Sequence, residues 1–173
     1  MTPAALRIRP ATESDLHALA AVERSAAVLF RGIGLDWIAE SPAMDLAVLD
    51  LCRAAGTLWI APDHDDRPTG FLAATDLDGA FFILELSVAA EHQGRGLGRA
   101  LLHAALDQAR WRYYGAAALT TYRDVPWNAP FYARHGFVAL REFDLSPGLK
   151  AKLADEARHG HDPDRRVAMA KVL

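Results

Sequence analysis

Glycine recurs at every second position of one short segment near the middle of this 173-residue sequence. Glycine lets the backbone turn its N–H groups toward one point without a side chain in the way. A helix-like apolar pattern follows the segment, and the first turn of a helix adds unpaired N–H groups and a positive dipole end. We therefore predict an anion site, with a pyrophosphate as its ligand, because two arginines add fixed charge at the same place. The segment consists of Gly94, Arg95, Gly96, Leu97, Gly98 and Arg99.

The spacing of these glycines argues against two common phosphate-binding motifs. A P-loop needs Gly-x-x-x-x-Gly-Lys-Ser/Thr, and no such Lys-Ser or Lys-Thr pair occurs near them. The dinucleotide fingerprint Gly-x-Gly-x-x-Gly would place the third glycine one residue later. It also needs an acid about twenty residues further on, where this sequence has Thr120, Thr121 and Tyr122. A nucleotide-binding protein of the Rossmann type is therefore a distant alternative.

Two motifs in this order resemble the GNAT N-acetyltransferase family. The run Gln93-Gly-Arg-Gly-Leu-Gly98 is similar to its Arg/Gln-x-x-Gly-x-Gly/Ala signature, which grips the pyrophosphate of acetyl-coenzyme A. About thirty residues later, Asn128, Tyr132 and the pair Gly136-Phe137 follow the family's Asn-x-x-x-x-Tyr-x-x-x-Gly-Phe pattern, here with an Asn-to-Tyr spacing of four. The resemblance covers most of the chain from Leu6 to Phe143. It makes acetyl-coenzyme A the expected cosubstrate.

The resemblance also implies a fold and a binding mode. We expect an α+β domain with a mixed, mostly antiparallel, twisted sheet of about six to seven strands, flanked by about four helices. Its two central strands, matching Phe81–Val88 and Ala116–Tyr122, splay apart in a V that takes the pantetheine arm, with Leu86 N–H near the thioester oxygen. The cofactor-binding residues implied in this way are Leu86, Ser87, Val88, Gln93, Gly94, Arg95, Gly96, Leu97, Gly98, Arg99, Asn128 and Tyr132.

Two residues are candidates for catalysis. Tyr132 resembles the family's proton donor to the leaving thiolate, although beside Phe131 it also fits a core aromatic. Glu85 stands two residues before Ser87, so the two share a strand face, and its apolar neighbours would partly desolvate it and raise its affinity for a proton. Glu85 then acts as a base, binds a cationic amine or pairs with an arginine. The family often deprotonates the amine through a water chain, so a dedicated base is not required.

Acceptor choice is expected to fall to the least patterned segments of the chain. Aromatic residues and one carboxylate favour a small cationic amine with an apolar body, but the acceptor itself stays open. A transferase with another acyl donor and a non-catalytic acyl-coenzyme A sensor are the remaining alternatives; the presence of Tyr132 argues against the sensor. The substrate-binding candidates are Phe30, Trp37, Glu85, Tyr122 and Trp127.

The elements that must position these residues follow from periodicity and turn signals. Three strands separated by polar turns precede the glycine segment, and helices alternate with strands after it. The expected strands are 6–9, 57–61, 69–75, 81–88, 116–122, 137–143 and 166–172; helices are expected from Thr12 or Ser14 to about 28–30, over 42–55, after 97, over 126–134 and between the last two strands. Residues 31–37 are expected to be irregular, since two glycines break their periodicity.

Composition bounds the remaining possibilities. A hydrophobic content of 51% in 173 residues suits a single domain over residues 1–173. The net charge of -3 favours neither nucleic acid nor a membrane surface, and no targeting or spanning segment stands out. The single cysteine, Cys52, fits a buried thiol and a cytoplasmic location. No metal is expected, because His159 and His161 lack further ligands and residues 63–66 have the pattern of a hairpin turn. Exposed apolar residues in the tail permit a homodimer.

Overall fold

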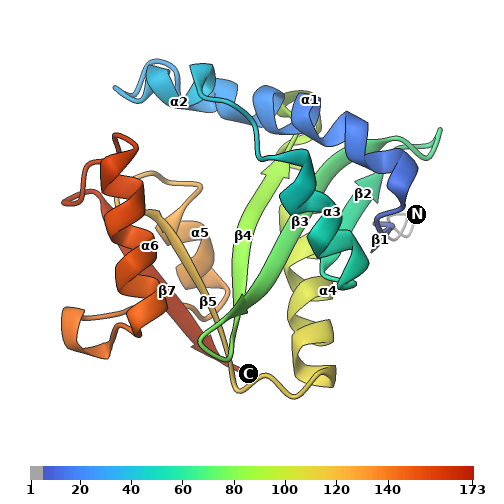
Figure 1. The fold of residues 1–173 in the computed structure, drawn as a ribbon. Coiled ribbons are helices and arrows are strands. Elements are labelled where there is room, and N and C mark those ends of the chain that lie inside the picture. Colours follow the sequence, from blue (N-terminus) through green and yellow to red (C-terminus); the bar gives the residue numbers. More distant parts are fainter. Residues whose placement is uncertain (1–5) are drawn as a thin grey trace. The chain divides into compact units, whose positions relative to one another are not determined.

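The computed structural model describes residues 6–173, which form one mixed sheet and six α-helices (Figure 1). The strand order is β1-β2-β3-β4-β5-β7-β6, so the α+β class with a mostly antiparallel sheet is confirmed. The strands are β1 (Arg9–Pro10), β2 (Leu58–Pro62), β3 (Pro68–Leu77), β4 (Ala80–Val88), β5 (Ala116–Tyr122), β6 (Val138–Ala139) and β7 (Arg166–Val172). The helices are α1 (Leu16–Ala27), α2 (Asp36–Glu40), α3 (Leu46–Ala54), α4 (Leu97–Trp111), α5 (Ala129–Arg134) and α6 (Pro147–Arg158), with single 3-10 turns at Glu13–Asp15, Val28–Phe30, Ala90–His92 and Glu142–Asp144.

The parallel pairing in the sheet joins β4 to β5. Phe81 pairs with Ala117 and Phe82 with Ala118. β5 is almost entirely apolar up to Leu119, as expected for a strand covered on both faces. The V-shaped splay expected beyond these paired residues stays a prediction.

The described residues divide into two compact units, 6–74 with 84–108 and 75–83 with 109–173. The single domain expected over 1–173 therefore stays a prediction. In the first unit, α1 and α3 cover one face of β2 and β3 (Figure 1), and their apolar side chains form a continuous core. Cys52 lies in this core, where burial raises the pKa of its thiol, so its interpretation as a structural residue holds. The core consists of Leu16, Leu19, Val22, Leu49, Cys52, Leu58, Ile60, Phe71, Ala73 and Ala89.

Helix α4 contacts the opposite face of β3. Phe71 and Ala73 face the core, so Gly70 faces the other way under the two-residue alternation of a strand. A Cβ at Gly70 would lie 3.3 Å from Leu101 Cδ1 of α4 and 3.1 Å from the carbonyl oxygen of Ser87. The missing side chain lets α4 and the end of β4 approach β3 closely.

The second unit is built on the antiparallel pair β5 and β7, which stay in register from Ala116 opposite Val172 to Tyr122 opposite Arg166. Helix α6 lies along both strands (Figure 1). Strand β6 pairs with β7 at two positions, Val138 with Ala170 and Ala139 with Met169. The last residues of β5 are thereby held between a strand and a helix.

Several element boundaries differ from the sequence expectation; β1 spans Arg9–Pro10 rather than 6–9, and α5 begins at Ala129 rather than at 126. Helix α3 begins at Leu46 rather than Pro42, because the carboxylate of Asp45 accepts a hydrogen bond from Ala47 N and caps the helix there. The strand expected over 137–143 ends at Ala139, and Arg141 and Asp144 close a turn through both backbone and side chain. The expected irregular segment 31–37 runs into α2, which begins at Asp36. Among the described residues, no helix combines the length and the apolar composition needed to cross a membrane.

Candidate anion-binding and acyl-transfer site

The glycine segment forms a left-handed turn that leads directly into α4. Gly94 and Gly96 have φ of 73° and 83°, a backbone conformation that glycine adopts at little cost. The first described N–H with a helical acceptor is that of Ala100, which bonds to Gly96 O. Within residues 6–173, the backbone N–H groups of Gly94–Arg99 find no acceptor. Six unpaired donors lie at the positive end of a 15-residue helix, which is what an anion site requires, and the predicted site stays a prediction.

The segment is held in place by side chains of the same unit. Gln93 Nε2 donates to the carbonyl oxygen of Val88 (2.8 Å), and the Arg95 guanidinium donates to the carbonyl oxygen of Glu91 (3.0 Å). Ser25 Oγ of α1 accepts from Ala90 N (3.0 Å) and donates to the Glu91 carboxylate (3.3 Å). Gln93 therefore closes the loop with its side chain, whereas its predicted contact with a cofactor stays a prediction. Ser25 was not recognised from the sequence, where a serine within a helix carries no distinguishing signal.

The predicted pairing of Glu85 with Ser87 on one strand face is present. Ser87 Oγ donates to Glu85 Oε1 at 2.6 Å, and Ser87 is buried while Glu85 is half-buried. The bond fixes the position of one carboxylate oxygen of Glu85. Such a group is suited to accept a proton or to bind a cationic amine. The arrangement does not distinguish between these two roles.

Asn128 in the second unit precedes α5 and is oriented by β5. Its Oδ1 accepts from Thr121 Oγ1 (3.0 Å) and from Tyr122 N (3.4 Å). Its own carbonyl oxygen accepts from Tyr132 N, so Asn128 also begins the helix that carries Tyr132. The Nδ2 group has no acceptor among the described residues. The amide can therefore donate hydrogen bonds to a ligand while its oxygen stays bound to the strand.

Tyr132 lies on α5 and is half-buried among aromatic rings. Its ring makes edge contacts with Phe131 (5.1 Å between centroids) and Phe137 (5.7 Å). Lys171 Nζ donates to the carbonyl oxygen of His135 at the end of the helix (2.8 Å), where a cation complements the helix dipole. Packing and this contact hold the backbone that carries Tyr132, and its predicted role as proton donor stays a prediction.

Tyr122, predicted to bind substrate, is buried in the second unit. Its hydroxyl lies 2.7 Å from His161 Nδ1, and its ring is only 2% exposed. Burial raises the pKa of the Tyr122 phenol, against the opposing charges of Arg166 and Arg165, and burial lowers the pKa of His161, with Arg166 adding to the effect. Both groups are therefore kept neutral, and the histidine tautomer decides which of them donates the hydrogen bond. The structure gives Tyr122 an internal partner, and a contact with substrate stays a prediction.

The remaining predicted acceptor residues are distributed over both units. Phe30 ends the 3-10 turn after α1, and Trp37 lies in the first turn of α2, both half-buried in the first unit. Trp127 precedes Asn128 in the second unit and is also half-buried. Their roles in acceptor choice stay predictions.

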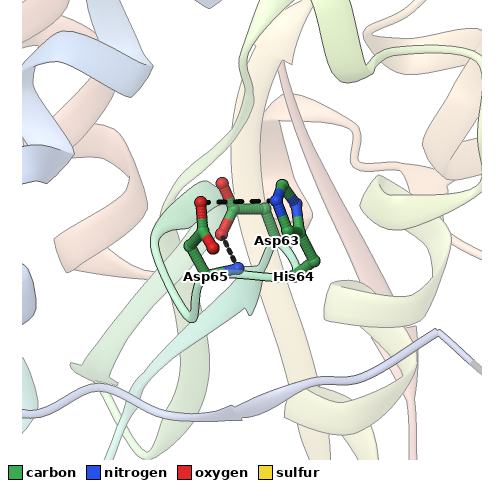
Figure 2. A group of neighbouring side chains, drawn as sticks. All are labelled: Asp63, His64 and Asp65. Atoms are coloured by element: carbon green, nitrogen blue, oxygen red, sulfur yellow. Dashed lines mark hydrogen bonds and ion pairs between the residues drawn. The ribbon is translucent and has the colours of Figure 1, made fainter.

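Figure 2 shows the group of Asp63, His64 and Asp65, whose side chains come together in the turn between β2 and β3. Asp63 Oδ1 accepts from the backbone N–H groups of Asp65 and Arg67, both at 2.9 Å, and the hydrogen bond from Arg67 is the main reason that the pKa of Asp63 is lowered. His64 and Asp65 are exposed. These contacts are those of a hairpin turn, as the sequence pattern indicated.

Comparisons with known proteins agree with the glycine segment and the second motif. Residues 54–139 match the family model described as "Acetyltransferase (GNAT) domain". The PaiA N-acetyltransferase of Thermoplasma acidophilum, solved with coenzyme A, superposes with a TM-score of 0.66 at 18% identity, over 98% of this chain and 99% of that one. A GNAT-family acetyltransferase of Staphylococcus aureus gives a TM-score of 0.72 at 17% identity, over 98% and 99% of the two chains. The N-acetylglutamate synthase of Neisseria gonorrhoeae, solved with coenzyme A and N-acetyl-glutamate, gives 0.72 at 19% identity, over 98% of this chain and 35% of its own length. At such identities the structural likeness establishes the shared fold.

Proposed function

This chain belongs to the GNAT acetyltransferases through the domain at residues 54–139, and from that premise we propose that it transfers the acetyl group of acetyl-coenzyme A directly to a primary amine. The observation that carries the proposal is the set of unpaired N–H groups at Gly94–Arg99. A pyrophosphate carries two linked anionic groups. Several backbone N–H donors at a helix N-terminus can bind both groups, whereas one cationic side chain cannot.

The remaining cofactor contacts follow from the second motif and from β4. Leu86 and Val88 offer backbone groups to the pantetheine arm, and Leu86 N–H stabilises the oxyanion that forms when the amine attacks the thioester carbonyl. Asn128 donates its Nδ2–H groups to the same arm, since its Oδ1 is already bound to β5. These assignments rest on the family resemblance and on the free donors of the two motifs.

The chemistry requires one bond to form and one to break. The neutral amine nitrogen bonds to the acetyl carbon, the carbon–sulfur bond breaks, and Tyr132 gives its phenolic proton to the departing thiolate. The amine proton passes to Glu85 or to water, and Glu85 can also hold the amine in place before transfer. Cys52 is buried in the core of the first unit, which argues against a covalent acyl-enzyme on that thiol.

The acceptor is proposed to be a small cationic amine with an apolar body. Phe30, Trp37 and Trp127 are half-buried aromatics that can contact such a body, and the carboxylate of Glu85 suits its charge. These aromatic residues and Glu85 favour a small molecule, and the net charge of -3 provides no basic field for nucleic acid. A cytoplasmic location is part of the proposal and rests on the free thiol of Cys52.

Calorimetric titration tests the proposal, using acetyl-coenzyme A, coenzyme A and NAD with the wild type and Gly96→Glu. Micromolar binding of coenzyme A that Gly96→Glu abolishes is the expected result, because a carboxylate would occupy the anion site. A thiol-release assay over a panel of amines then separates an acetyltransferase from a coenzyme A sensor, and the same assay with longer acyl donors tests the alternative donor. Absence of coenzyme A binding would overturn the proposal, and binding of NAD would favour the dinucleotide alternative.

A further inference from the structure

We propose that Tyr122 and His161 are positioning residues that hold the Asn128 side chain in its ligand-binding orientation. Asn128 is proposed above to bind coenzyme A, so the functional consequence of this inference rests on that proposal. The positioning itself concerns contacts within the second unit and can be tested in the free protein.

The Asn128 amide is held from the last two residues of β5. Thr121 donates to Asn128 Oδ1 through its side chain at 3.0 Å, and Tyr122 donates to the same oxygen through its backbone N–H at 3.4 Å. The second bond is long, so its strength depends on where the backbone of Tyr122 lies. Any group that fixes Tyr122 therefore also fixes the amide of Asn128.

The Tyr122 side chain is fixed from two directions. Its hydroxyl bonds to His161 Nδ1 at 2.7 Å, and the Arg166 guanidinium lies over its ring at 4.8 Å from the centroid. Arg166 is also the residue opposite Tyr122 in the β5–β7 pairing. The hydroxyl bond links β5 to a segment outside the sheet, and so it prevents the end of the strand from rotating about its axis.

His161 is itself tied to the end of α6. Its backbone N–H donates to the carbonyl oxygen of Glu156 (3.1 Å). The buried carboxylate of Glu156 accepts from Arg166 Nε (2.9 Å) and from Thr120 Oγ1 (2.5 Å). Helix α6, β5 and β7 therefore meet at one buried group of hydrogen bonds. Its members Thr120 and Arg166 lie next to Thr121 and opposite Tyr122, the two residues that hold Asn128.

The Tyr122–His161 bond joins two groups that burial keeps neutral, and the histidine tautomer decides which of the two atoms donates. Burial lowers the pKa of His161, and Arg166 on β7, Lys152 on α6 and His159 beside it lower it further, against the opposing charge of Glu156 on α6. Tyr122 faces it from β5. A protonated His161 would still donate from Nδ1 to the tyrosine oxygen, so the contact does not depend on this titration.

The first measurement is the side-chain amide signal of Asn128 in the nitrogen-15 spectrum of the free protein, assigned by its loss in Asn128→Ala. Tyr122→Phe removes only the hydroxyl and keeps the ring. It should increase the ps–ns mobility of this amide or broaden its signal, while His159→Gln should leave it unchanged. His159 is the matched control because it stands two residues from His161 with an exposed side chain. An unchanged Asn128 amide in a folded Tyr122→Phe protein would overturn the inference.

The second measurement is kinetic. Tyr122→Phe should raise KM for acetyl-coenzyme A on the order of fivefold, the effect of one lost hydrogen bond, with kcat unchanged. The increase should be absent in the Asn128→Ala background, because Tyr122 acts through Asn128. An increase that persists in Asn128→Ala would overturn the inference. If the wild type binds no coenzyme A but the amide still responds to Tyr122→Phe, the proposed function fails and the positioning stands.

Discussion

Replacing Gly94 by alanine separates anion binding from backbone strain. Gly94 has φ of 73°, and a Cβ there would meet no atom within 4 Å, so alanine causes no clash. Its cost is the left-handed conformation itself, about 1–2 kcal/mol for a residue with a side chain. Gly79, in the turn between β3 and β4, has φ of 79° and equally open surroundings. Gly79→Ala should therefore lose a similar amount of stability, and it serves as the matched control.

The two variants should differ in coenzyme A binding. An alanine at position 94 can relieve the strain by taking a negative φ. That change rotates the neighbouring peptide groups and turns their N–H donors away from the anion. Loss of two charge-assisted hydrogen bonds at about 1.5 kcal/mol each amounts to about 3 kcal/mol, or on the order of 100-fold in Kd. Titration calorimetry gives the affinity, and thermal unfolding gives the stability, for which each kcal/mol corresponds to about 2–4 °C in a chain of this size. A Gly94→Ala protein that binds coenzyme A as tightly as Gly79→Ala would refute the reasoning.

Three further substitutions test other parts of the molecule. Tyr132→Phe should lower kcat by about 10²-fold or more in steady-state kinetics, because the proton donor to the sulfur is lost. KM for acetyl-coenzyme A should stay the same, and an unchanged kcat would exclude that role. Glu85→Gln should raise KM for the amine but leave the Kd for coenzyme A unchanged in calorimetry, and weaker coenzyme A binding would contradict an acceptor-side role. Asp15→Asn should cost about 3 kcal/mol in urea unfolding at pH 7, because Asp15 is 5% exposed and binds Arg9 at 2.7 Å. Burial alone would raise the pKa of Asp15, but its hydrogen bonds from Arg9 and Thr12 hold it below the ordinary 3.8, so this stability is present above pH 3.8 and is lost as the pH falls through the lowered value. A difference between Asp15→Asn and wild type that persists in stronger acid would contradict that assignment.

The fold class was predictable because its signals are local and repeated. Alternation marked the strands, a helical period marked α4, and the two motifs gave their order along the chain. Short elements were harder to predict, because a single contact decides them. One hydrogen bond from Ala47 N to the Asp45 carboxylate sets the start of α3, and the turn closed by Arg141 and Asp144 follows β6. Neither contact has a period that a sequence pattern could reveal.

Side-chain roles were predictable only where both partners lie close together in the sequence. Glu85 and Ser87 are two residues apart on one strand, so alternation predicts that they share a face, and the structure adds the hydrogen bond between them. Tyr122 and His161 are 39 residues apart, and their contact depends on how α6 returns the chain to β7. No sequence pattern indicates this internal partner of Tyr122, and the predicted contact of Tyr122 with substrate stays a prediction.

The first position of the glycine signature gains a physical meaning from Gln93. Its side-chain amide donates to the carbonyl oxygen of Val88, which joins the end of β4 to the loop before the first glycine. Arginine carries donors on a side chain of comparable length, so both residues that the signature allows there can make this bond, whereas a glutamate has no donor to offer. The signature thus combines a side chain that fixes the loop with glycines that free its N–H groups. In the proposed function the backbone of residues 94–99 recognises the anion, while the Arg95 guanidinium is already bound to the carbonyl oxygen of Glu91.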